Sequence, residues 1–117
     1  GLAGFADERI LRALQTIHAA PDRPWTVADL ARVAGLSRTA FSNRFHELLD
    51  HTPLGYLTDW RMQLARRLLI DSDLPIIDVA ERSGYQSEAA FGRVFKKHFE
   101  TPPASFRRSR DAARLAQ

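Results

Sequence analysis

One local pattern occurs twice in this chain and limits what it can fold into. A short amphipathic segment leads to a glycine, then to a polar residue and a Phe-x-x-x-Phe segment, once over Thr26–Phe45 and again over Pro75–Phe95. The glycines, Gly35 and Gly84, lie 49 positions apart. Glycine accepts the positive φ that ends many helices, so each copy is typical of a helix-turn-helix unit. Two such units predict a helical chain with an internal structural repeat.

Apolar residues at steps of three or four predict seven helices and no strand. The helices are expected at about 7–19, 26–36, 37–49, 53–70, 75–84 and 87–99, with a short seventh helix around Phe106. The fold class is therefore all-α, with two helix-turn-helix subdomains joined by a long linker helix. We predict a first subdomain at 1–52, the linker at 53–70, a second subdomain at 71–110 and a disordered tail at 111–117.

Polar residues stand where helices should begin. Asp7 is a candidate N-cap, and Thr26 with Asp29 three positions later forms a variant of the capping box. Ser37 and Ser87 precede the second helix of each repeat in the same way. The caps support the predicted boundaries.

The linker segment carries an apolar seam of Leu57, Trp60, Leu64 and Leu68, which we expect to be core. At about 1.5 Å per residue it would be about 27 Å long. Such a helix could hold two similar units near successive turns of a DNA duplex, about 34 Å apart.

Composition favours a globular chain and adds little about function. The 117 residues include 17 basic and 14 acidic side chains, and the net charge of +3 is weak evidence for nucleic acid. All of that excess lies in residues 59–117. There is no cysteine, which fits a reducing cytoplasm, and no apolar run reaches the roughly 20 residues that span a bilayer. The four histidines form no metal-ligand pattern, and no catalytic constellation or cofactor motif stands out, so we expect neither an enzyme nor a cofactor.

Two successions of residues run through positions 26–107. The first contains Leu30-Ala31, Gly35-Leu36-Ser37, Phe41, Phe45 and Pro53-x-x-Tyr56-Leu57, and the second contains Ile77-x-Val79-Ala80, Gly84-Tyr85, Phe91-x-Arg93-x-Phe95-Lys96-Lys97 and Pro103-x-x-Phe106-Arg107. This order of motifs resembles the DNA-binding domain of the AraC/XylS family of bacterial transcription regulators. The family usually has glycine where this chain has Asp50 and Glu100, so we expect slightly altered helix ends there.

The resemblance implies that recognition helices at about 37–49 and 87–99 enter successive major-groove segments of a promoter. Base contacts carried over by position are Arg38, Thr39, Ser42 and Asn43 in the first lobe and Glu88, Ala89, Gly92 and Arg93 in the second. Phosphate contacts are expected from Ser37, Arg44, Ser87, Lys96, Lys97, Pro103 and Arg107. The implied partners are double-stranded DNA and RNA polymerase, with no membrane. Effector binding and dimerisation would belong to a separate domain.

Other readings of these residues remain open at this stage. Glu88 could stabilise its helix N-terminus instead of reading a base, and Arg93 could pair with Asp78 or Glu81. A helical protein-interaction module without DNA binding is the main alternative function, and a small ligand sensor or enzyme is another.

Overall fold

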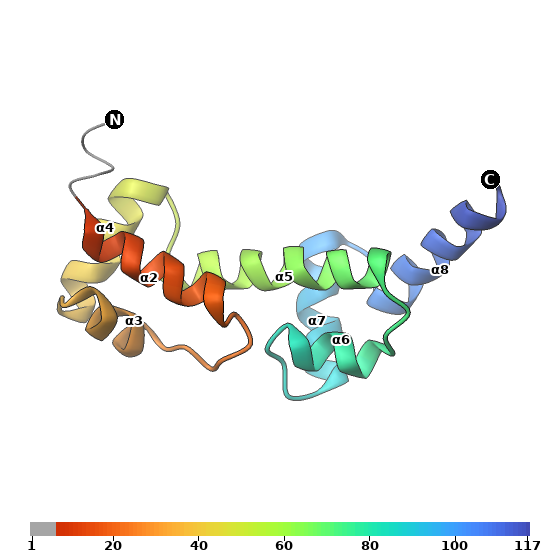
Figure 1. Cartoon of the computed structure of the whole chain (residues 1–117), viewed down its shortest axis with the longest axis horizontal. Coiled ribbons are helices and arrows are strands. Elements are labelled where there is room, and N and C mark those ends of the chain that lie inside the picture. The colour runs from red at the N-terminus through yellow and green to blue at the C-terminus, as the bar shows by residue number, and fades with distance from the viewer. Residues whose placement is uncertain (1–6) are drawn as a thin grey trace. The chain divides into compact units, whose positions relative to one another are not determined.

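The chain is described over residues 7–117 by a computed structural model, which contains seven helices and no strand within that range. They are α2 (Glu8–Ala19), α3 (Val27–Ala34), α4 (Arg38–Leu49), α5 (Pro53–Asp71), α6 (Ile76–Arg82), α7 (Glu88–Phe99) and α8 (Pro103–Leu115) (Figure 1). This confirms the all-α class and the seven helices. Residues 1–6, where the predicted first subdomain begins, lie outside the described residues. None of the helices within 7–117 is long and apolar enough to cross a membrane.

The helices form two compact units, one ending at Trp60 and the other beginning at Arg61. The boundary falls inside α5, so this long helix contributes residues to both units. The reason is that α5 has core residues at both of its ends, Leu57 in the first unit and Met62 to Leu69 in the second.

In the first unit, α2 packs on α3 and α4, and α3 packs on α4 (Figure 1). Its buried core consists of Ile10, Ala13, Ile17, Leu30, Ala31, Ala34, Phe41, Phe45 and Leu57. α3 ends at Gly35, whose φ of 72° is a left-handed conformation. Glycine adopts that conformation without strain, which explains the first turn of the repeat.

In the second unit, α6 and α8 pack on α7. The buried core is Met62, Ala65, Leu69, Val79, Ala80, Phe91 and Phe95. Gly84 has a φ of 95°, and a Cβ at this position would lie 2.8 Å from Nε of Arg61. Because the guanidinium is the far end of a flexible side chain and could shift, the positive φ, and not space, is the reason for glycine here.

The caps lie where the sequence places them. The Thr26 amide donates to Oδ2 of Asp29 and the Asp29 amide donates to Oγ1 of Thr26, each over 3.1 Å, which completes the capping box. Asp7 accepts from the Ile10 amide over 3.2 Å at the start of α2. Each of these bonds satisfies an amide that the helix itself leaves unpaired.

Trp60 corrects the predicted seam of α5. Its side chain is 37% exposed, whereas Leu57, Met62, Ala65 and Leu69 form the buried face of the helix. The His18 ring stacks on the indole, with ring centroids 3.8 Å apart. Leu64 and Leu68, also placed in the seam, are half-buried.

The C-terminal helix is longer than the sequence predicts. α8 runs to Leu115, so most of the segment expected to be a disordered tail is helical. Long-range bonds from its arginines hold it. Arg110 donates to the carbonyls of Leu69 and Ser72 over 2.9 and 2.7 Å, and Arg114 donates to the Ile70 carbonyl over 2.8 Å. These contacts join residues about forty positions apart, beyond the reach of local sequence patterns.

The ends of α4 and α7 also differ from expectation. Asp50 and Glu100 take φ values of 55° and 64°, so both helices keep a left-handed cap although neither residue is glycine. Their amides donate to the carbonyls of His46 and Lys96. The altered ends we expected are therefore absent from these two helices, and the backbone holds two strained residues instead.

Candidate nucleic-acid interface

The N-terminus of α4 presents a polar face because two phenylalanines fix the opposite face. Phe41 and Phe45 are completely buried in the first core. Oγ of Ser37 accepts from the Ala40 amide over 3.1 Å, which sets the helix start. Ala40, in the first turn of α4, is exposed.

Four predicted base-contact residues gather around one shallow hollow on the first unit. Arg38, Thr39 and Asn43 are exposed and Ser42 is half-buried. Their side chains line the hollow together with Val27, the first residue of α3. Sequence reasoning missed Val27 because it lies on the other helix of the repeat. The available signal was its position directly after the Thr26 cap. This places Val27 at the N-terminal end of α3, just as the residues after Ser37 stand at the N-terminal end of α4.

The second unit repeats this construction in α7. Ser87 caps the helix by accepting from the Ala90 amide over 3.0 Å, and Phe91 and Phe95 are completely buried. The face left outside contains Glu88, Ala89 and Arg93, which are exposed, and Gly92, which is half-buried. Lys96 and Lys97 are exposed in the last turn.

Two details of α7 bear on the alternatives left open by the sequence. Within residues 7–117 Arg93 forms no ion pair with Asp78 or Glu81, so its guanidinium stays available to a ligand. A Cβ built at Gly92 would meet no atom within 4 Å, so packing does not require glycine there. Glu88 lies in the first turn of α7, where its charge also favours the helix dipole, and both roles remain compatible with its position.

Arg44, a predicted phosphate contact, is held by two carboxylates. Its Nε donates to Oδ2 of Asp7 over 2.5 Å and its Nη1 donates to Glu47 over 3.1 Å. Burial by itself would raise the pKa of Asp7, but the bonds from Arg44 and from the Ile10 amide lower that pKa overall. The bond to Asp7 is the main reason why the pKa of Arg44 is raised. These two carboxylates therefore fix the position of the Arg44 guanidinium and neutralise part of its charge.

Two other predicted phosphate contacts lack geometric support. Arg107 donates to the carbonyls of Leu68, Leu69, Ser72 and Leu74, so four of its five donors serve the end of α5 and the loop after it. Burial lowers its pKa. Pro103 is buried and has no backbone N–H, so only the amides that follow it could donate to a phosphate.

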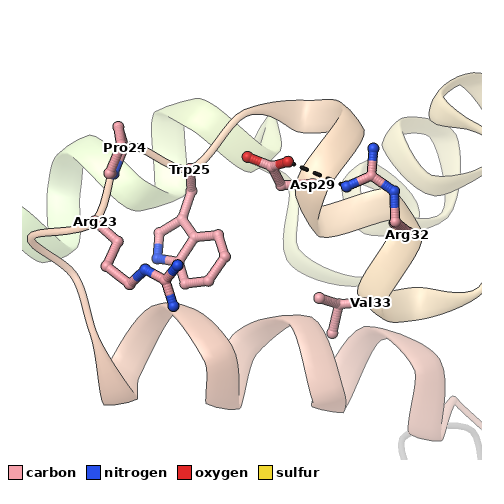
Figure 2. Close-up of a pocket in the computed structure, with 6 residues that line it drawn as sticks. All are labelled: Arg23, Pro24, Trp25, Asp29, Arg32 and Val33. Atoms are coloured by element: carbon pink, nitrogen blue, oxygen red, sulfur yellow. Dashed lines mark hydrogen bonds and ion pairs between the residues drawn. The ribbon is translucent and has the colours of Figure 1, made fainter.

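A second hollow lies elsewhere on the first unit. Arg23, Pro24, Trp25, Asp29, Arg32 and Val33 line it (Figure 2). The guanidinium of Arg23 lies 4.9 Å from the Trp25 ring centroid, and Arg32 donates to Asp29 over 3.3 Å. No residue lining this hollow lines the one beside Thr39. Within residues 7–117 no group of three or more side chains suited to a metal ion occurs.

Comparison with known proteins identifies the family to which most of the chain can be matched. Residues 30–109 match the family described as a helix-turn-helix domain. The solved DNA-binding domain of AdpA, in complex with a target DNA, superposes with a TM-score of 0.85 at 30% identity, covering 95% of this chain and 99% of that one. The chain belongs to the AraC-type helix-turn-helix family. The C-terminal domain of AraT, a response regulator from Geobacillus stearothermophilus, gives a TM-score of 0.83 at 31% identity, covering 88% of this chain and 86% of that one.

Curated AraC-type relatives agree. A putative AraC-like transcription regulator of Streptomyces lividans is 41% identical over 107 residues, which cover 92% of this chain and 35% of the relative. The regulator AlkR of Acinetobacter baylyi is 41% identical over 106 residues, covering 91% of this chain and 35% of the relative. This AraC-type domain thus spans about a third of the length of these relatives. Its family consists of DNA-binding transcription regulators. Membership of this family does not favour the alternative function, a protein-interaction module without DNA binding.

Proposed function

We propose that this AraC-type domain binds a promoter by inserting α4 and α7 into successive major-groove segments. The observation that carries the proposal is the matched construction of the two helices. Each has a serine cap and a completely buried Phe-x-x-x-Phe pair, and each leaves its predicted base-contact residues on an accessible face. A helix that lies in the major groove needs this arrangement, because base edges are read by side chains near its N-terminus.

The first unit supplies mostly neutral reading chemistry. Asn43 can form two hydrogen bonds with adenine, and Ser42 can donate or accept. Arg38 suits the O6 and N7 acceptors of guanine, and Thr39 adds a methyl group. All four side chains line one hollow, so they would face the same few base pairs.

The second unit supplies charged reading chemistry. Arg93 suits guanine, and Glu88 can accept from the amino group of cytosine. Ala89 offers a methyl group to thymine. Gly92 leaves open space that would let the backbone approach the duplex.

Phosphate contacts would fix the register of both helices. Lys96 and Lys97 are exposed and therefore suited to this role. The hydroxyl protons of Ser37 and Ser87 can donate outward, since the oxygens already accept from helix amides. Arg44 could contribute through its remaining donors, whereas Arg107 and Pro103 are left out for the reasons given above.

The wider role rests on the family. We propose that the domain regulates transcription in the bacterial cytoplasm, together with RNA polymerase. Effector binding and dimerisation, where they occur, would belong to a separate domain.

Selection of bound duplexes from a random library tests this function, followed by titration of the selected site at two salt concentrations. Arg93→Ala should weaken binding to the selected site by about 1–3 kcal/mol and relax one base position. Lys96→Ala should weaken all sequences alike and make the salt dependence shallower by about one unit. Arg67→Ala, an exposed arginine on α5, serves as the charge-matched control. Failure to enrich any sequence, or an Arg93→Ala variant with unchanged preference, would contradict the proposal.

A further inference from the structure

The hollow beside Thr39 on the first unit has an apolar wall that the sequence did not reveal. Of the five residues that line it, Val27 alone has a side chain built only of carbon and hydrogen. Val27 is half-buried and packs against the first core. The capping box of Thr26 and Asp29 holds this first turn of α3 in place. The valine methyls are therefore fixed instead of swinging freely at the surface.

Thr39 stands on the α4 side of the same hollow and adds a γ-methyl group. Polar groups of Ser42, Asn43 and Arg38 line the rest. An apolar wall within a polar rim suits a ligand that carries one methyl group among hydrogen-bonding atoms. In the major groove that description fits thymine, whose C5-methyl is the apolar mark that distinguishes it there.

We propose that Val27 and Thr39 form a methyl-binding hollow that selects thymine at one position of the DNA site. The inference rests on the proposed function, since it requires α4 to lie in the major groove. Val27 then becomes a specificity-determining residue although it lies on the first helix of its repeat and not on the recognition helix. Burial of one methyl group predicts a preference of about fourfold over the same base without the methyl.

Replacing thymine with deoxyuridine tests this directly, because uracil differs from thymine only by the missing C5-methyl. Each thymine of the selected site is replaced in turn, and affinity is measured for the wild type and for Val27→Ala. The wild type should lose about fourfold at one position. Val27→Ala should lose less than twofold at that position. Val33→Ala is the matched control, since Val33 is another half-buried valine of α3 and lines the second hollow, and it should keep the full penalty.

Thr39→Ser gives an independent measurement, because it removes the methyl and keeps the hydroxyl at an exposed position where folding is not at risk. It too should reduce the uracil penalty. The proposal is overturned if uracil costs nothing at every position, or if the penalty survives undiminished in both Val27→Ala and Thr39→Ser. Failure to select any duplex would refute the proposed function itself, and that result is distinct from specific binding that ignores the thymine methyl.

Discussion

Arg107 offers the sharpest test of how the second unit is held together. Arg107→Met removes the guanidinium and keeps most of the aliphatic stem. Among the four carbonyls that accept from Arg107, those of Leu69 and Ser72 also accept from Arg110. The Leu68 carbonyl also accepts from the amide and hydroxyl of Ser72. Within the described residues, the Leu74 carbonyl is therefore the only one of the four that would be left without any donor.

One carbonyl that loses a charged donor sets the expected cost. Hydrogen bonds to charged groups contribute about 1.5–3 kcal/mol, so Arg107→Met should lower the free energy of unfolding of this unit by about that amount. Removing Arg107 and Arg110 together should cost more than the sum of the single changes, because each arginine still serves Leu69 and Ser72 when the other is missing. Arg108→Met is the control, since within residues 7–117 Arg108 bonds only to the nearby Ser105 hydroxyl. It should change stability by less than about 0.5 kcal/mol.

The assay must follow the second unit. Both tryptophans, Trp25 and Trp60, belong to the first unit, so their fluorescence would report on the wrong part of the chain. Native-state hydrogen exchange of amides in residues 61–117 is the suitable measurement. A loss below 0.5 kcal/mol for Arg107→Met, or strict additivity with Arg110→Met, would refute the reasoning. A shallower salt dependence of DNA binding at unchanged stability would instead favour the phosphate contact first expected of Arg107.

Further substitutions and a change of pH also have defined outcomes. Glu100→Gly should raise the free energy of unfolding in urea titration by about 0.5–1 kcal/mol, because glycine relieves the strain of the left-handed conformation. Asp50→Gly should gain less, since Asp tolerates that conformation better. A lower free energy of unfolding would show that no strain is present. Gly92→Ala should raise the free energy of unfolding by about 0.5–1 kcal/mol in thermal denaturation, because the added Cβ meets no atom within 4 Å. A decrease would show that the added Cβ clashes with a neighbouring group. Burial lowers the pKa of His18 from 6.5, so the unfolded chain takes up the proton at higher pH and stability should fall as pH drops below 6.5. Urea midpoints followed by Trp60 fluorescence would test this, and His18→Gln should reduce the dependence.

The caps and turns could be predicted from the sequence because their causes are local. The capping box of Thr26 and Asp29 spans three positions, and the turn at Gly35 needs only one residue of positive φ. Helical spacing likewise places Phe41 and Phe45 on one face of their helix, and both are buried. Such features depend on neighbours within one turn, where periodicity and residue chemistry carry the information.

Features that depend on distant residues were missed. Trp60 was expected in the core, yet its exposure depends on what α2 brings near it, namely His18. The length of α8 depends on arginines that reach carbonyls about forty positions away. The candidate site was predicted only in part for the same reason, because the hollow joins Val27 of α3 to residues of α4.

Under the proposed function the two units would contribute differently to binding. In the first unit Asp7 and Glu47 neutralise part of the charge of Arg44, so Arg38 is the charged side chain left beside the hydrogen-bonding and apolar groups of the hollow. Both lysines of the chain, Lys96 and Lys97, stand exposed on α7, and the whole net charge of +3 comes from the second half. Phosphate attraction depends on salt, whereas base-edge contacts largely do not. Changes in the first unit should therefore alter which sequence is preferred, while loss of the α7 lysines should alter how strongly any duplex is held.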